Sequence, residues 1–224
     1  DLGIPLSQAP WISYGSDTML FHPDQGCKKS FRTEQGISDD ALIVVYAGKL
    51  IESKGGKLLA ETFAKKFPDD REIDLAAVGN TSGDYGNEVE DIFQKSENRI
   101  IRFPTQKYQD LAYYFQIADL AVFPKQCSLS FYDVQACGLP VLSEDNNINI
   151  DRCSHQNGWT FRNGNMEDFR EKIIEIANMD ETEYKKVSEN AYRYILDNYN
   201  YEEKAREYEA VIKAAYDDFK ERIK

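Results

Sequence analysis

The sequence has little histidine and lacks the common motifs of hydrolytic and zinc-dependent enzymes. It contains two histidines, His22 and His155, and no GxSxG, HExxH or CxxC pattern. Neither histidine stands at a recognisable spacing from a serine or cysteine nucleophile, so a hydrolase triad has no support. The glycine-containing stretch at residues 48–56 lacks the closing Gly-Lys-Ser/Thr of a Walker loop, which argues against a nucleoside triphosphatase.

Basic residues are scarce, and long apolar runs are absent. Lys and Arg number 27 against 39 Asp and Glu, and the formal net charge of -12 argues against general binding to nucleic acid or acidic membranes. No apolar run approaches membrane-spanning length, and no signal peptide is visible. We therefore expect a cytoplasmic location, or a peripheral one at the inner face of a membrane.

Cysteines are also few, namely Cys27, Cys127, Cys137 and Cys153. They show no zinc-like spacing with a histidine, so we expect unpaired thiols in a reducing compartment and no metal site. The chain begins at Asp1 without a methionine, and we expect it to be a piece of a longer protein.

Short apolar segments alternate with amphipathic ones along the middle of the chain. Uniformly apolar runs such as residues 43–46 fit strands that are buried on both faces. The alternation predicts an α/β fold, a Rossmann-like parallel sheet with helices on both faces. The predicted strands span residues 43–47, 73–78, 100–103, 120–123, 140–143 and 157–161, and the predicted helices span 57–67, 87–94, 108–117, 129–137, 167–177, 182–198 and 202–221.

Residues 1–40 show little periodicity, although Asp17 is placed to cap a short turn that runs to Phe21. In an open parallel sheet, ligands bind outside the carboxyl ends of the strands. The loops after residues 47, 78, 103, 123 and 143 are therefore the candidates for a binding cleft, and the glycine-bracketed residues 79–83 would line it.

The loop after the first predicted strand has the composition of a phosphate holder. Gly48 and Lys49 follow the apolar run, and Lys54 precedes two glycines and a predicted helix. Glycines let the backbone approach an anion, helix N–H groups bind it, and lysines neutralise its charge. The alternative is an ordinary strand-to-helix turn with solvated lysines.

Two further loops could complete such a site. Ser128 is a candidate N-cap, so the N–H groups of Ser128, Leu129 and Ser130 could bind a second anionic oxygen, and Asp133 could bind the diol of a ribose. The alternative is an ordinary capped helix with Asp133 in solvent. The loop containing Thr105 and Gln106 could bracket a nucleobase, although a surface turn is the simpler interpretation.

Five blocks of this sequence resemble those of GT-B glycosyltransferases, in particular the large retaining family 4 (glycosyl transferases group 1). Residues 48–55 (GKLIESKG) resemble the family's G-R-L-x-x-x-K-G loop. Residues 118–124 (ADLAVFP), 133–141 (DVQACGLPV) and 156–161 (QNGWTF) resemble A-D-x-x-x-x-P, E-A-x-A-C-G-x-P-V and x-N-G-x-x-F. Residues 13–21 (SYGSDTMLF) resemble the P-N-G-V-D-x-x-x-F that joins the two halves of such enzymes. The blocks occur in the family's order.

The resemblance implies the C-terminal, donor-binding half of a GT-B enzyme. Residues 1–37 would be the interdomain linker and crossover segment, 38–198 the nucleotide-sugar domain, and 199–224 a helix that packs toward a missing N-terminal domain. Lys49 and Lys54 would contact the diphosphate of a UDP-, GDP- or ADP-sugar. The sugar would pass, with retention, to a hydroxyl of a glycan or lipid-linked acceptor bound by the missing half, with no cofactor and no obligatory metal. This piece alone would be inactive, and any membrane contact would be made by the missing half.

The sequence departs from the family's pair of glutamates. Asp133 falls on the second glutamate, and the first falls on Lys125 or is deleted. Gln126, Ser128 and Ser130 could supply hydrogen bonds to the sugar instead. The departure leaves two alternatives open: an epimerase or phosphorylase on the same scaffold, and a non-catalytic nucleotide-sugar-binding domain.

Overall fold

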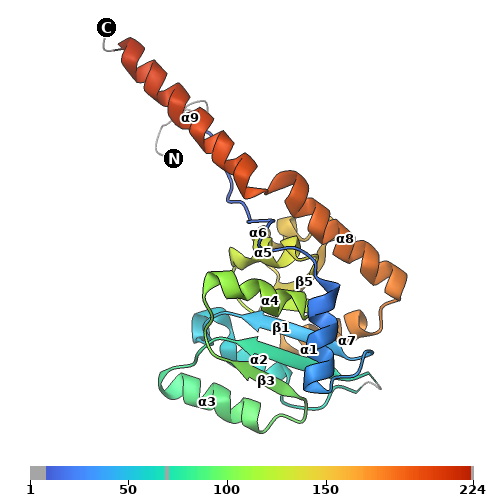
Figure 1. Cartoon of the computed structure of the whole chain (residues 1–224). Coiled ribbons are helices and arrows are strands. Elements are labelled where there is room, and N and C mark those ends of the chain that lie inside the picture. Colours follow the sequence, from blue (N-terminus) through green and yellow to red (C-terminus); the bar gives the residue numbers. More distant parts are fainter. Residues whose placement is uncertain (1–8, 69–70, 223–224) are drawn as a thin grey trace.

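The computed structural model describes residues 9–68 and 71–222 (Figure 1). The strands are β1 (Leu42–Ala47), β2 (Ile73–Val78), β3 (Ile100–Phe103), β4 (Leu120–Phe123), β5 (Val141–Glu144) and β6 (Gly158–Phe161). The α-helices are α1 (Gln25–Gln35), α2 (Gly56–Thr62), α3 (Gly83–Gln94), α4 (Leu111–Gln116), α5 (Ser130–Ala136), α6 (Asn147–Arg152), α7 (Met166–Ala177), α8 (Glu181–Asn198) and α9 (Tyr201–Arg222). Two short 3-10 helices are η2 (Glu52–Lys54) and η3 (Tyr108–Asp110).

The strands form one six-stranded sheet in the order β3-β2-β1-β4-β5-β6, and every pairing is parallel. This is the Rossmann order, in which the sheet grows first in one direction from β1 and then in the other. The predicted α/β fold is therefore confirmed. The reversal lies between β1 and β4, which are direct neighbours in the sheet.

The apolar strands are sandwiched between two hydrophobic cores, because successive side chains of a strand point to opposite faces. In β1, Ile43 and Val45 face the core beneath α1, α4, α5 and α8. Leu42 and Val44 face the core beneath α2, α3 and α7. Burial on both faces explains why the strand sequences are uniformly apolar rather than alternating.

Two helices fall where the sequence predicts none. Helix α1 lies within residues 1–37, the predicted linker, and its Phe31 side chain is buried in the core. It is capped by the Asp24 carboxylate at its start and by Gly36, at φ 60°, at its end. Helix α6 is capped by the Asn146 side chain. Both helices contain few apolar residues, so hydrophobic periodicity does not reveal them.

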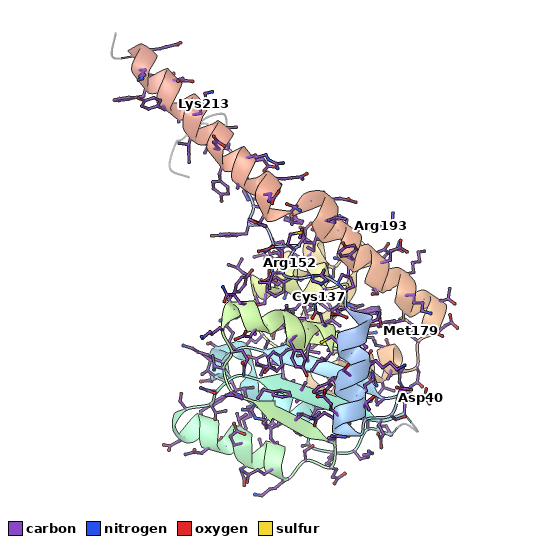
Figure 2. The ribbon with its side chains drawn as sticks, viewed as in Figure 1. Asp40, Cys137, Arg152, Met179, Arg193 and Lys213 are labelled. Carbon is purple, nitrogen blue, oxygen red and sulfur yellow. The ribbon has the colours of Figure 1, made fainter. Side chains whose placement is uncertain are left out.

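The chain leaves the sheet domain at a crossing of two segments. The Ser16 N–H donates to the Tyr199 carbonyl at 2.8 Å, and the Tyr201 N–H donates to the Ser16 carbonyl at 3.0 Å. Beyond this crossing, α9 extends away from the sheet domain, with side chains such as Lys213 standing clear of it (Figures 1 and 2). None of the helices in the described ranges combines the length and apolarity needed to cross a bilayer.

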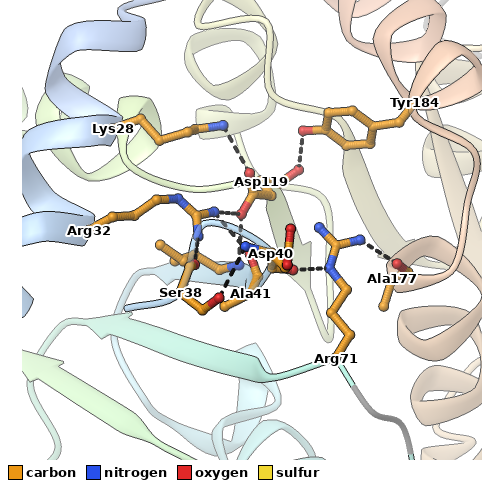
Figure 3. A network of polar contacts seen from close by, with 10 residues as sticks. Lys28, Arg32, Ser38, Asp40, Ala41, Arg71, Asp119, Ala177 and Tyr184 are labelled. Carbon is orange, nitrogen blue, oxygen red and sulfur yellow. Dashed lines mark hydrogen bonds and ion pairs between the residues drawn. The ribbon is translucent and has the colours of Figure 1, made fainter. Parts of the chain in front are cut away.

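An ionic network holds the amino edge of the sheet together. Asp119, which precedes β4, pairs with Arg32 at 2.6 Å and Lys28 at 3.0 Å, and it accepts the Ile43 N–H at 2.8 Å. The Tyr184 hydroxyl donates to the Asp119 carbonyl at 2.7 Å, so α1, α8, β1 and β4 meet at this residue (Figure 3). The A-D-x-x-x-x-P block thus has a structural role at the edge opposite the predicted binding loops.

Candidate functional site

The loops after β1 and β4 meet at the point where the strand order reverses. Gly55 has φ 73°, and a Cβ placed on it would come within 2.9 Å of the Pro124 Cβ and 3.1 Å of the Lys125 Cβ. Only glycine fits both the left-handed backbone and the close approach. In open α/β sheets this reversal point is where ligands bind, outside the carboxyl ends of the strands. The fold therefore brings Lys54 and Lys125 to a ligand-binding position.

The loop after β1 is held in a fixed shape by its neighbours. The Gly48 N–H donates to the Val78 carbonyl at 2.9 Å, and the Leu50 N–H donates to the Asn80 carbonyl at 3.2 Å. The Tyr46 hydroxyl donates to the Lys49 carbonyl at 2.8 Å. The Gly48 N–H is therefore already engaged by the end of β2, and the role of Gly48 beside a phosphate stays a prediction.

Both predicted phosphate-binding lysines are free of acidic partners. Lys49 is exposed and Lys54 is half-buried. No ion pair involves either ammonium group, or that of Lys125, in the part of the chain that the structure describes. In a chain with net charge -12, unpaired cations beside a ligand-binding edge favour an anionic ligand.

The loop after β4 differs from the prediction at its junction with α5. The helix begins at Ser130, with Leu129 rather than Ser128 in the N-cap position. The Ser128 hydroxyl accepts the Ser130 N–H at 3.2 Å. That amide is therefore engaged within the chain in this structure, and its binding to an anion stays a prediction. Leu129 is 55% exposed.

Gln126 adopts an uncommon backbone conformation in this same loop. It is exposed and has φ 69°, in the left-handed region that side-chain-bearing residues rarely occupy. Such strain often occurs at functional sites, where the surrounding structure maintains it. Gln126 was predicted as a sugar contact, and its backbone turns the loop at the position where that contact is expected.

Arg152 of α6 contacts the loop after β4, and no sequence motif predicts this contact. Its guanidinium donates to the Ser128 carbonyl at 3.0 Å and lies 5.0 Å from the ring centroids of both Phe131 and Tyr132. Arg152 forms no ion pair with any described residue. The β4 loop is therefore fixed by a cation whose charge is stabilised by aromatic faces.

The loops after β2 and β3 are joined by a reciprocal pair of hydrogen bonds. The Asn80 N–H donates to Thr105 Oγ1 at 3.2 Å, and the Thr105 N–H donates to Asn80 Oδ1 at 3.0 Å. The Gln106 side chain donates to the Pro104 carbonyl at 2.8 Å. Beside them, a recess of about 250 Å³ is lined by Asn80 and Pro104, among others. Thr105 and Gln106 thus lie at the predicted edge, next to a small hollow.

Asp133 is buried rather than solvated. It is 8% exposed, and its Oδ1 accepts hydrogen bonds from the Ser16 hydroxyl at 2.7 Å and the Tyr108 hydroxyl at 3.2 Å. The pKa of Asp133 is raised to about 6, chiefly by burial and to a smaller extent by the charge of Asp17, while the hydrogen bonds from Ser16 and Tyr108 act in the opposite direction. The simple picture of a capped helix with a solvated carboxylate is therefore wrong.

The larger hollow of the domain lies elsewhere. A cavity of about 810 Å³ opens at the amino edge, lined by residues that include Arg32, Asp119 and Tyr184. Its charged groups include those of the Asp119 network, which are paired with one another. Its position at the amino edge places it away from the loops that bind ligands in this topology.

Comparisons with known proteins agree with this geometry. The family described as glycosyl transferases group 1 matches residues 28–194. D-inositol 3-phosphate glycosyltransferase of Segniliparus rotundus is 28% identical over 137 residues, 58% of this chain and 30% of that protein. The chain matches only 30% of that relative and 45% of a probable sucrose-phosphate synthase of Thermosipho melanesiensis.

Solved structures share the fold at lower identity. Anabaena Alr3699/HepE in complex with UDP and glucose has a TM-score of 0.78 at 18% identity, over 91% of this chain and 56% of that one. The C-terminal domain of a glycosyl transferase group 1 family protein (LpcC) from Francisella tularensis has a TM-score of 0.67 at 17% identity, over 83% of this chain and 99% of that one. With the family match covering most of the domain, this chain belongs to the glycosyl transferases group 1 family.

Proposed function

We propose that this chain is the donor-binding domain of a glycosyltransferase, which binds a nucleotide-diphosphate sugar for transfer to an acceptor hydroxyl. The observation that supports this most is the contact between Gly55 and Pro124 at the strand reversal, which joins the loops of Lys54 and Lys125. Anabaena Alr3699/HepE, which shares the fold, has been solved with UDP and with UDP-glucose. UDP-sugars are accordingly the first donors to test, followed by GDP- and ADP-sugars.

In this proposal the chemistry depends on the departing diphosphate. Negative charge grows on that group as the glycosidic bond breaks, so fixed cations stabilise the transition state more than the ground state. Lys49 and Lys54 supply those cations, and Gln126, Ser128 and Ser130 supply hydrogen bonds to the sugar. Retention of configuration follows from the resemblance to family 4. The acceptor, a glycan or a lipid-linked sugar, is bound outside this domain.

Helix α9 is the proposed contact with the acceptor-binding part of the protein. Its apolar side chains lie largely in solvent: Tyr208 is 42% exposed, Ile212 66%, Tyr216 55% and Phe219 59%. Spacings of three and four residues place them on one face of the helix. A face of this kind is stabilised by burial against another surface. We infer that it packs on the acceptor-binding domain.

Thermal denaturation with nucleoside diphosphates tests the proposal. A ligand that binds only the folded state raises its melting temperature. UDP, GDP or ADP should do so for this chain, and the double variant Lys49→Ala/Lys54→Ala should abolish the shift. The matched control is Lys186→Ala/Lys213→Ala, which removes two exposed, unpaired lysines from α8 and α9. Equal shifts in both double variants would contradict the assigned roles.

Lys125 favours a second candidate, a non-catalytic nucleotide-sugar-binding domain. A lysine in place of the family's first glutamate removes a carboxylate from the sugar side of the site. A product assay on the full-length protein separates the candidates. Glycosylated acceptor supports the transferase, whereas nucleotide binding without any turnover supports the non-catalytic domain.

A further inference from the structure

We propose that Ser16 and Tyr108 are positioning residues that orient Asp133, so that the segment entering the domain forms part of the donor site. The inference rests on the proposed function, because it assigns to Asp133 the ribose of the bound nucleotide. Neither Ser16 nor Tyr108 belongs to the loops that follow β1 and β4. The hydrogen bonds that join them to Asp133 link segments 117 and 25 residues apart in the sequence.

The two hydroxyls both donate to one oxygen of the Asp133 carboxylate and leave the second oxygen free to accept hydrogen bonds. Both donate to Oδ1, at 2.7 Å from Ser16 and 3.2 Å from Tyr108. No described residue donates to Oδ2. A carboxylate has about four acceptor positions, and Oδ2 is not among the fully enclosed side-chain atoms of the described residues that lack a partner, so a ligand can reach it. The remaining oxygen is therefore suited to accept hydrogen bonds from the vicinal hydroxyls of a ribose.

Ser16 is itself held rigidly. It is fully buried, and its backbone is fixed on both sides by the hydrogen bonds to Tyr199 and Tyr201. A Cβ on the preceding Gly15 would come within 2.6 Å of the Tyr201 Cα, so the two segments pass each other without room for a side chain. A hydroxyl on such a support can hold Asp133 in one rotamer.

Tyr108 is held by a ring contact with Phe21, although it is not buried. Its ring lies edge-on to Phe21, with 5.2 Å between the ring centroids, although the residue is 52% exposed. Phe21 is fully buried in the core and comes from the same N-terminal segment as Ser16. The Ser16 hydroxyl belongs to that segment, and the Tyr108 ring packs on it through Phe21. The N-terminal segment therefore positions both donors to Asp133 Oδ1.

The test compares each nucleoside diphosphate with its 2′,3′-dideoxy counterpart. Binding of UDP, GDP and ADP to this chain is measured by calorimetry, and the tightest binder is paired with the analogue that lacks both ribose hydroxyls. Ser16→Ala and Tyr108→Phe should each weaken binding of the natural nucleotide about three- to tenfold, the range for one net hydrogen bond, and should leave binding of the analogue within about twofold. The ratio of the affinity for the natural nucleotide to the affinity for the dideoxy analogue should therefore fall in both variants.

Matched controls come from the same segments. Ser13→Ala removes a buried hydroxyl that has no hydrogen-bond partner, and Tyr113→Phe removes a hydroxyl three residues from η3 that touches neither Asp133 nor Ser16. Both should retain the wild-type preference for ribose. Because Tyr108 is half exposed, Tyr108→Phe is expected to fold even if Ser16→Ala does not.

The outcomes separate this inference from the proposed function. A wild-type chain that binds none of the three nucleotides overturns both. A wild type that binds nucleotide and analogue equally, or variants that keep the wild-type preference, overturn the positioning role alone. Hydrogen exchange gives a second readout: nucleotide should slow exchange of the Ser16 and Tyr201 amides in the wild type, and the dideoxy analogue should not.

Discussion

Gly55 lies so close to Pro124 that a single Cβ on the glycine would come within 2.9 Å of the Pro124 Cβ. This contact joins the loops after β1 and β4, and the lysines on those loops depend on it for their relative positions. The two loops are therefore packed closely against each other at this point. The contact can be broken by adding one methyl group.

Gly55→Ala should weaken nucleoside diphosphate binding by at least about tenfold, because both the left-handed φ and the contact with Pro124 resist a side chain. Gly36→Ala is the matched control. Gly36 has a similar φ of 60°, but a Cβ there meets nothing within 4 Å. It should cost about 1 kcal/mol of stability and leave binding unchanged. Equal binding by the two variants, measured by calorimetry, would show that the junction does not shape the site.

Lys125→Glu places a carboxylate where the family has one. The loop of Lys125 adjoins that of Lys54 at Gly55, so reversing this exposed charge beside the proposed diphosphate site should weaken nucleotide binding about three- to tenfold at low salt. The loss should shrink as salt is raised from about 30 to 300 mM, because exposed charges are screened. Lys186→Glu on α8 changes the net charge equally and serves as the control. A salt-independent loss, or an equal loss in the control, would contradict the placement.

The raised pKa of Asp133 gives the protein a defined pH dependence. A buried carboxyl with a pKa of about 6, against 3.8 when unperturbed, binds more protons in the folded state than in the unfolded state between those values. Its contribution therefore makes the folded state less stable as the pH rises from about 4 to about 6, by up to about 3 kcal/mol. Above pH 6 the ionised carboxylate remains, facing Asp17, the Ser16 and Tyr108 hydroxyls and the buried Cys137 thiol.

Asp133→Asn should remove that dependence, because the amide does not titrate. The difference in urea denaturation free energy between variant and wild type should shift in favour of the variant between pH 5 and pH 7.5, in line with the pKa of about 6. A difference that stays constant across this range would mean that Asp133 titrates at its ordinary pKa. Nucleotide affinity of the wild type should fall below pH 6, since a protonated carboxyl accepts ribose hydroxyls less well.

Asp119→Ala should destabilise the domain by about 3–5 kcal/mol, because it leaves the buried Arg32 guanidinium without its carboxylate. Asp91→Ala is the contrast, since Asp91 pairs with Lys95 on the surface of α3 and should change stability by less than about 1 kcal/mol. Urea denaturation measures both. Similar losses in the two variants would show that the amino-edge network contributes no more than a surface pair.

The sequence predicted the sheet better than it predicted the site. Strands β2, β3 and β4 have the predicted bounds, because each is an apolar run closed by a glycine or proline that fixes its end. Helix α1 was missed because only Phe31 and Arg32 are buried along its length, and its caps, Asp24 and Gly36, are evident only in the structure. Caps without an apolar stripe are a weak signal.

The site residues that were missed share one property: their partners are distant in the sequence. Ser16 and Tyr108 are ordinary polar residues until the fold places them against Asp133. Arg152 likewise acquires its role only through its contact with the Ser128 carbonyl. The start of α5 also differs from the prediction by one residue, because hydrophobic periodicity does not decide which residue caps a short helix.

The crossing of residues 13–16 with residues 199–201 has a mechanical consequence. The two segments exchange backbone hydrogen bonds, and Gly15 lies in close contact with Tyr201. They therefore cannot rotate independently of each other. A rotation imposed through α9 must therefore reach Ser16, and through its hydroxyl the carboxylate of α5. The domain thus joins α9 to the proposed nucleotide site through consecutive hydrogen bonds, from Tyr201 through Ser16 to Asp133.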